Sequence, residues 1–463
     1  MKNETLLLQG GASCKISSSA DGEVILVKDR AESLATWIVC VFMAFAPVLD
    51  PYVLPLTSAG VRVNDLLVIL VVAYLLLSKK CSWDKRGVSL MVLATTFLFC
   101  TLLSVLEDAI GRDVGVALRI AFIYLVYACF YSAISGRAVL SNFAKVATWV
   151  AIFGTVLLFL QYLLPGSMWD GRLPLALSES DQFMSLIDPT TGEVRPHGFF
   201  QEVSYYALYV APVLMCSIKG GRFAVSAFLS VGLLLSSSLL GFIALGIACC
   251  FAASKVRDAA GNVDWRKVAL VASAVFFLVL TIVFLIALGV VPFLNSVADL
   301  VARRVGSILD INATYNWGRS SAQLRLLGNV GLFSEYDSFQ KLFGLGVGEY
   351  ANVFSGVETT YGSSMVNMLL GFGAVGAVAL IAWSMFLVKE ARRGMRVFPA
   401  LVVLALFTDN VLFGWYFFYL LSWVDVNSAI RPAGLCSSID AKQSKQRLEY
   451  RLHELSRIGD SRC

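Results

Sequence analysis

The chain has 463 residues, of which 58% are hydrophobic and only 15% are charged. Soluble domains carry about 25% charged residues, so this composition excludes an ordinary soluble protein and predicts an all-α, polytopic membrane protein. The formal net charge of +5 is too small to indicate a nucleic-acid partner. The cysteines fall in apolar runs or basic flanks without metal-site spacing, so we expect no disulfide framework, no metal and no cofactor.

Apolar runs near the length that crosses the hydrocarbon core recur along the chain. Single spans are predicted at 34–56, 64–78, 87–106, 116–134, 138–164, 203–218, 268–292 and 364–388. The run 222–254 is too long for one span, and "SSSLLG" at 236–241 favours a turn in its middle. The run 398–424 is interrupted by "TDN". Two helices in each give about twelve spans, with ten or eleven as alternatives because 398–424 is short for two crossings.

Basic connections predict the orientation, because short cytoplasmic loops are rich in Lys and Arg. They occur at 79–86, 137–145, 219–222, 255–267 and 389–396, and the C-terminal tail is basic too. Every second connection and both termini are therefore expected in the cytoplasm. The predicted organisation is an N-terminal tail (1–33), a transmembrane domain (34–424) and a C-terminal tail (425–463). Two large loops, at about 165–202 and 293–360, fall on the outer side.

The second loop contains a predicted surface helix. Over 296–312, apolar residues recur at helical spacing beside Arg303 and Arg304, a pattern typical of an amphipathic helix on the membrane surface. Further along, Arg319 is a candidate phosphate ligand, because arginine binds phosphate through a planar, permanently charged fork. The Gly344-x-Gly346-x-Gly348 spacing allows a phosphate-binding loop, but we interpret it as a tight turn.

The first loop ends in "RPHGFFQEVSYYALY" at 195–209, which joins an ionisable cluster to an apolar helix. Glu202 is expected just before a helix that starts near Val203, where the helix dipole favours a carboxylate. Arg195 has a structural alternative as a surface arginine that reaches lipid headgroups. Both residues lie where a span meets the outer loop, and charges at membrane depth usually mark a functional pathway.

Three segments together resemble the O-antigen polymerase and ligase superfamily of bacterial surface-polysaccharide synthesis. "RPHGFFQEVSYYAL" is similar to the family's Arg-x-x-Gly-x-Phe-x-Glu-x-Ser entry into a helix. "GRSSAQLRLLGN…KLFGLGVGEY" is similar to its arginine segment followed by a Gly-x-Gly-x-x-Tyr turn. "GSSMVNMLLGFGAVGAV" (362–378) is similar to its helix after the large loop. The resemblance covers most of 34–424 and implies a fold like that of the GT-C glycosyltransferases.

The resemblance implies a glycosyltransferase on the periplasmic face of the bacterial inner membrane. It would polymerise oligosaccharide units carried on undecaprenyl pyrophosphate, with a chain-length regulator and a flippase as possible partners and membrane lipids around it. Arg195 and Arg319 would stabilise the pyrophosphate leaving group, and Glu202 or Glu349 would be the general base. The expected substrate-binding residues are Arg303, Arg304, Arg325 and Tyr361.

One departure from the family concerns the start of the third segment. Ligase members typically carry a His-Asn pair there, and this chain has Gly362-Ser363. This favours a polymerase over a ligase and leaves the base open between the two glutamates. A lipid-linked oligosaccharide flippase is the rival from another class. Transporters usually bind substrate on broken helices within internal repeats, and the sequence shows no clear repeat.

Overall fold

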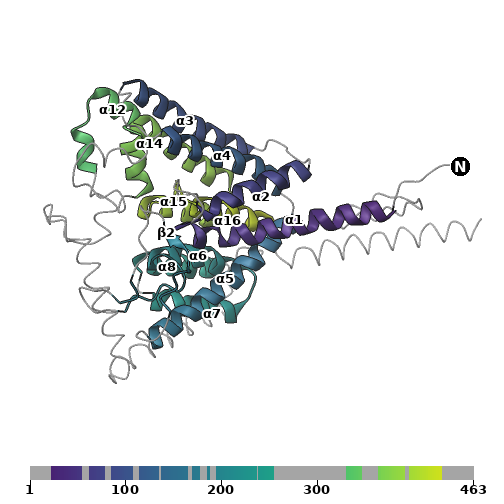
Figure 1. Ribbon diagram of the computed structural model, residues 1–463. Helices are drawn as coiled ribbons and strands as arrows, with labels where there is room; N and C mark the ends of the chain where they lie inside the picture. Colours follow the sequence, from purple (N-terminus) through teal and green to yellow (C-terminus); the bar gives the residue numbers. More distant parts are fainter. Residues whose placement is uncertain are drawn as a thin grey trace, which may run out of the picture.

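The structure, a computed structural model, describes residues 22–54, 62–78, 85–107, 114–134, 137–164, 169–177, 185–187, 194–236, 238–254, 330–346, 363–391 and 396–429. These residues form a helical bundle (Figure 1). Its helices are α1 (Gly22–Leu49), α2 (Val63–Ser78), α3 (Lys85–Glu107), α4 (Val114–Ile134), α5 (Arg137–Leu163), α6 (Val203–Lys219), α7 (Phe223–Leu235), α8 (Leu239–Ser254), α12 (Ser338–Phe343), α14 (Ser364–Glu390), α15 (Val397–Thr408) and α16 (Trp415–Ala429). A 3-10 turn, η2 (Val330–Ser334), precedes α12.

Apolar length and apolar surface both point to a lipid environment. Three helices, at Lys85–Glu107, Val139–Leu163 and Ser364–Glu390, are long and apolar enough to cross a membrane, and shorter apolar helices accompany them. Many large apolar side chains are exposed on the surface of the bundle, including Trp149 at 71% and Phe153 at 65%. A soluble monomer rarely exposes contiguous apolar surface of this kind. These are the properties of a helical membrane protein.

The predicted interruptions of the two long runs are confirmed. α7 ends at Leu235 and α8 begins at Leu239, and α15 ends at Thr408 before α16 begins at Trp415. The predicted end of the first span at 56 is wrong, because α1 ends at Leu49 and a short strand follows. The predicted span 268–292 and surface helix 296–312 lie outside the described residues.

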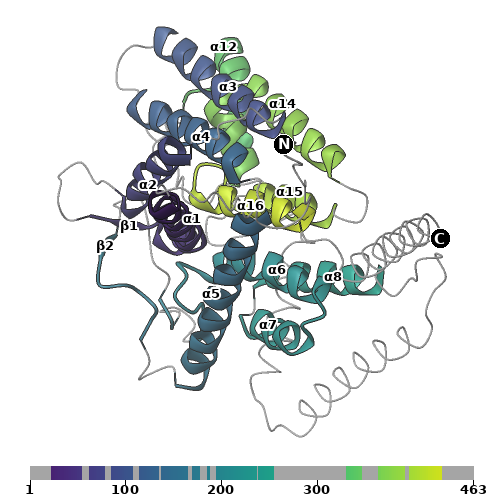
Figure 2. The same ribbon diagram turned by 90° about the vertical axis from the view of Figure 1, so that its right-hand side faces the viewer.

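The last described helix, α16, lies at the centre of the bundle. α3, α4, α12 and α14 pack together on one side of it, and α5 to α8 pack on the other (Figures 1 and 2). α16 itself contacts α1, α5, α6 and α15. Residues 415–426 are all buried. Within this buried stretch, the ring of Tyr419 stacks on Tyr209 of α6 at a centroid distance of 4.3 Å. The central helix therefore depends on contacts from both sides.

A two-stranded sheet joins the first connection to the predicted outer loop. β1 (Tyr52–Val53) pairs antiparallel with β2 (Ala176–Leu177), with Tyr52 opposite Leu177. The Tyr52 hydroxyl also accepts a hydrogen bond from the Leu173 amide at 2.9 Å. Segments on either side of four described helices, α2 to α5, are thereby held at the same end of the bundle. We call this end the Asp50 end, after the residue that follows α1.

The opposite end of the bundle contains a buried ion pair. Arg86, at the start of α3, pairs with Asp425, near the end of α16, and the Asp425 side chain is only 9% exposed. The pair lines a small cavity of about 10 Å³ together with Trp383 and Leu421. The Trp383 indole N–H donates to the Ser89 hydroxyl at 3.2 Å. This end fixes the C-terminal part of α16 to α3.

Candidate functional site

The segment that carries Arg195 is folded into the bundle. Residues 196–200 are buried, and the fully buried Gln161 of α5 holds their backbone. Gln161 donates to the Gly198 carbonyl at 2.7 Å and accepts from the Gly198 amide at 2.9 Å. It also accepts from the His197 amide at 3.2 Å. Arg195 is therefore half-buried at the edge of a fixed segment, where its own amide donates to the Leu186 carbonyl at 2.8 Å.

A glycine is required inside this segment. Gly198 has a φ of +68°, and a Cβ there would lie 2.7 Å from the Gly154 carbonyl oxygen. Both the backbone angle and the close approach to α5 exclude a larger residue. The Gly-x-Phe part of the sequence pattern thus has a packing reason: glycine allows contact with α5, and Phe200 fills the space beneath it with no exposed surface.

Removing the Gln161 amide should loosen the Arg195 segment. In Gln161→Leu, the buried peptide groups of residues 197 and 198 lose their partners, and we expect the free energy of unfolding to fall by about 2 kcal/mol. Thermal unfolding in detergent measures this loss. Leu163→Ala, at an exposed position on the same helix, serves as the control and should change stability by less than about 0.5 kcal/mol. Equal melting temperatures for the two variants would contradict the role of Gln161.

Glu202 is the N-cap residue of α6, so the predicted helix start at Val203 is confirmed. Its extended backbone leads into the helix, but its side chain makes no capping hydrogen bond. The carboxylate instead accepts a hydrogen bond from the Ser204 hydroxyl. Beside it, the Tyr205 ring stacks on Tyr416 of α16 at 4.6 Å. This pair of stacked rings connects α6 to α16.

The second and third segments of the sequence pattern dock onto each other through their backbones. α14 is broken at Gly373, which has φ +63° and ψ −162°. Near the break, the Leu370 carbonyl accepts from the Leu345 amide at 3.2 Å, and the Gly371 carbonyl accepts from the Gly346 amide at 2.8 Å. The turn interpretation of the glycine spacing is confirmed for its described part, since Gly344 and Gly346 both have positive φ. The break is therefore filled by the protein's own amides.

The connection between α15 and α16 brings the third segment toward the first. The buried Ser364 hydroxyl, at the start of α14, donates to the Asp409 carbonyl at 2.8 Å. It also accepts from the amides of Val411 and Leu412 at 2.8 and 3.0 Å. Ser363, the second residue of the Gly362-Ser363 pair, caps α14 by accepting from the Val366 amide. The 409–414 connection thus contacts α14, and Tyr416 just after it contacts α6.

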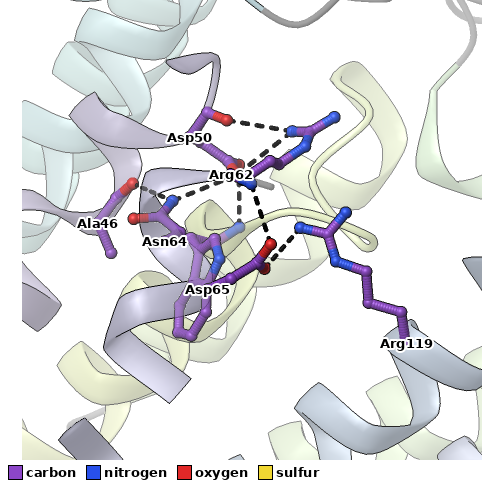
Figure 3. Close-up of polar contacts among 7 residues, drawn as sticks. Ala46, Asp50, Arg62, Asn64, Asp65 and Arg119 are labelled. Carbon is purple, nitrogen blue, oxygen red and sulfur yellow. Dashed lines mark hydrogen bonds and ion pairs between the residues drawn. The ribbon is translucent and has the colours of Figure 1, made fainter. Parts of the chain in front are cut away.

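Asp50 anchors the start of α16 from a distant part of the sequence. One carboxylate oxygen accepts from the Trp415 amide at 3.0 Å, and a carboxylate at a helix N-terminus is stabilised by the unpaired amides there. The other oxygen accepts from the Asn64 side chain at 3.3 Å and lies 3.6 Å from the Arg62 guanidinium. Arg62 also donates to the Asp50 carbonyl at 3.1 Å. Figure 3 shows these side chains converging from α1 and α2.

A second ion pair extends this network to α4. Asp65, in the first turn of α2, accepts from the Arg119 guanidinium at 2.6 Å and from the Arg62 amide at 3.0 Å (Figure 3). Burial raises the pKa of the Asp50 carboxyl, which follows the last residue of α1, while Arg62, the Trp415 amide, Asn64 and Arg119 act in the opposite direction. We call Asp50, Arg62, Asn64, Asp65 and Arg119 the Asp50 cluster.

Only two of the predicted site residues lie in the described part of the chain. Arg195 and Glu202 lie just before α6, whose first turn contacts the start of α16 at the Asp50 end. The remaining predicted residues lie outside the described residues; they are Arg303, Arg304, Arg319, Arg325, Glu349 and Tyr361. Within the described chain, no three His, Cys, Asp or Glu side chains form a group suited to a metal ion.

The Asp50 cluster was missed by the sequence analysis, although a signal for it exists. Arg119 lies inside the predicted span 116–134, and Asp50 lies inside 34–56. Ionisable residues within spans usually face the bundle interior and mark functional pathways. The same rule therefore indicates Asp50 and Arg119, whose side chains help to connect α1, α2, α4 and α16.

Neither a known family model nor a curated protein matches the chain. The fold and the site therefore define its class by themselves: a helical membrane protein with an ionisable site at one end of its bundle.

Proposed function

We propose that this protein is a membrane glycosyltransferase that polymerises oligosaccharide units carried on a polyprenyl pyrophosphate. The observation that supports the proposal is that the second segment contacts the third, and that the first and third both contact the chain at the start of α16. Tyr205 of the first segment stacks on Tyr416, Ser364 of the third segment holds the connection just before Tyr416, and the 344–346 turn of the second segment pairs with α14. Residues that are far apart in sequence thus surround one end of the bundle.

The proposed reaction breaks the bond between the sugar anomeric carbon and the pyrophosphate oxygen. The electron pair leaves with the pyrophosphate, whose developing charge Arg195 and Arg319 stabilise. A sugar hydroxyl of the second lipid-linked glycan forms the new glycosidic bond, and its proton passes to Glu202 or Glu349. Arg303, Arg304, Arg325 and Tyr361 would bind the substrate around this centre. The arginines supply the cationic charge, so the proposed mechanism is independent of a metal.

The proposed topology has about twelve spans in the inner membrane of a bacterium. Both termini are placed in the cytoplasm, and the Asp50 end faces the periplasm, because the connections 79–86, 137–145 and 389–396 are basic. Loops 165–202 and 293–360 then lie on the same side as the site. The proposed product is a surface polysaccharide, with a chain-length regulator and a flippase as partners.

The break in α14 bears on the rival flippase function. Transporters use the exposed ends of broken helices to bind substrate. Here the Leu370 carbonyl already accepts from the Leu345 amide and from the Tyr336 hydroxyl, at 3.2 and 3.1 Å. A break that is filled internally favours a structural role over a transport site. A ligase that uses another acceptor shares the same donor chemistry, and Gly362-Ser363 in place of the His-Asn pair favours the polymerase.

The test of this proposal is polymer formation by the purified protein. We expect wild-type protein, given a lipid-pyrophosphate-linked repeat unit without nucleotide, to produce a ladder of products on a gel. Arg195→Ala and Arg319→Ala should reduce product at least about 100-fold, and Arg195→Lys should rescue poorly because it lacks the bidentate fork. Arg222→Ala, an exposed arginine at the start of α7, is the matched control and should retain full activity.

Two results would overturn the proposed polymerase. Wild-type product levels in Arg195→Ala would remove the residue from the reaction. Movement of labelled lipid across the bilayer without any ladder would replace the enzyme by a flippase, and Arg195 would then act as a headgroup guide. Folding of each variant is checked by its melting temperature, so a loss of activity is not confused with a loss of structure.

A further inference from the structure

Arg119 lies on the apolar helix α4 and uses only part of its hydrogen-bonding capacity within the described residues. Its side chain is 40% exposed, and one of its five N–H donors bonds to Asp65 at 2.6 Å. The guanidinium makes no other hydrogen bond to the described residues. Its neighbours on the helix surface are apolar and open, with Leu118 54% exposed and Phe122 51% exposed. Donors that are held in place beside an apolar surface suit a ligand that carries both an anion and a hydrocarbon chain.

An apolar surface continues from Arg119 along two adjacent helices. α2 and α4 contact each other, and both expose large side chains at helical spacing. On α4 these are Phe122 and Leu125, and on α2 they are Leu66 at 41% and Ile69 at 64%. Since α2 and α4 both begin at the Asp50 end, the chain of a bound lipid would run from Arg119 toward the middle of the bundle.

The charge balance of the Asp50 cluster favours a lipid over a free anion. Arg62 and Arg119 are matched by Asp50 and Asp65, so the cluster is neutral overall. Each carboxylate holds one guanidinium group: Asp65 accepts from Arg119 at 2.6 Å, and Asp50 lies 3.6 Å from Arg62 (Figure 3). A neutral cluster attracts a free phosphate only weakly, because the carboxylates repel it. A phosphate attached to an apolar chain gains burial of that chain against α2 and α4 as well.

We propose that Arg119, supported by Arg62, binds the phosphate headgroup of a lipid whose hydrocarbon chain lies against α2 and α4. This site uses other elements than Arg195, because Arg119 lies on α4 and Arg195 precedes α6. Binding itself does not depend on the proposed enzyme. The further assignment of this site to the second lipid-linked glycan rests on the proposed function.

The experiment uses the purified full chain in a maltoside detergent and three probes. Farnesyl pyrophosphate carries both chain and headgroup, inorganic pyrophosphate carries only the anion, and farnesol carries only the chain. Titration calorimetry should show the tightest binding for farnesyl pyrophosphate. Arg119→Ala should weaken that binding about tenfold, and Arg119→Lys should weaken it less. Phe122→Ala should weaken farnesyl pyrophosphate binding and leave inorganic pyrophosphate binding unchanged.

Two control variants decide which arginine is responsible. Arg222→Ala, at the start of α7, should bind as wild type does. Unchanged affinity in Arg119→Ala, or a loss confined to Arg195→Ala, would overturn the Arg119 site. Equally tight binding of inorganic and farnesyl pyrophosphate would overturn the lipid assignment and leave a free-anion site.

Failure of the proposed function can be told apart from failure of this inference. A wild-type protein that binds farnesyl pyrophosphate through Arg119 but makes no ladder would support the lipid site and refute the polymerase. A protein that makes a ladder with full yield in Arg119→Ala, and whose affinity is unchanged, would refute the lipid site and leave the polymerase intact.

Discussion

Gly373→Ala is expected to separate the 338–346 segment from α14. An alanine Cβ at this position would lie 2.4 Å from both the carbonyl carbon and oxygen of Leu342, and the residue would have to keep a φ of +63°. Backbone strain costs about 1–3 kcal/mol and overpacking costs a similar amount, so the free energy of unfolding should fall by about 3 kcal/mol or more. Thermal unfolding measures the loss, and trypsin cleavage after Lys341 reports the release of α12.

Gly246→Ala is the matched control for the same chemical change. Gly246 lies in α8, and a Cβ there would meet no atom within 4 Å. Because alanine is favoured over glycine inside a helix, this variant should be as stable as wild type or up to about 1 kcal/mol more stable. If Gly373→Ala behaved like Gly246→Ala and Lys341 stayed protected, the docking of the 344–346 turn would not stabilise the fold.

Asp50→Ala is expected to destabilise the bundle by about 2–3 kcal/mol. The substitution removes the acceptor for the Trp415 amide and leaves the Arg62 guanidinium without the carboxylate that lies 3.6 Å away. Removing one member of a buried pair costs about 3–5 kcal/mol, and the 16% exposure of the Asp50 side chain reduces this figure. Thermal unfolding in detergent should place Asp50→Asn between wild type and Asp50→Ala.

A double variant separates the charge effect from the loss of the cap. Asp50→Ala combined with Arg62→Ala removes both charges, so it should be less destabilised than the sum of the two single variants. Asp170→Ala, at an exposed carboxylate, is the surface control and should change stability by less than about 0.5 kcal/mol. Strict additivity of the two single variants would show that Asp50 and Arg62 are not coupled.

Local patterns were sufficient for the helices but not for the break in α14. The serines at 236–238 and the polar residues at 408–410 interrupt apolar runs that are too long for one helix, so these ends could be predicted. Gly373 gives no such signal, because glycine is common within membrane helices. Its conformation depends on the 344–346 turn, which supplies amides from outside the helix.

The candidate site could be predicted only where a local pattern marks it. Arg195 and Glu202 were found because they flank the start of an apolar helix. The partner of Asp50 is an amide 365 residues away, and no periodicity in either segment indicates that contact. Gln161 was missed for the same reason, since a single glutamine in an apolar run does not reveal that it holds a distant loop.

The contacts at the two ends of α16 can form only after α16 itself has been synthesised. Its first residue is held by Asp50, and its last turns are held by Arg86. Both partners are made before α16, because Asp50 follows α1 and Arg86 belongs to α3. Until the ribosome has produced α16, these charges lack their final neighbours, and the aromatic rings of α6 lack Tyr416 and Tyr419. A chain that stops before residue 415 would therefore lack the Trp415 amide that binds Asp50 and the Asp425 carboxylate that pairs with Arg86.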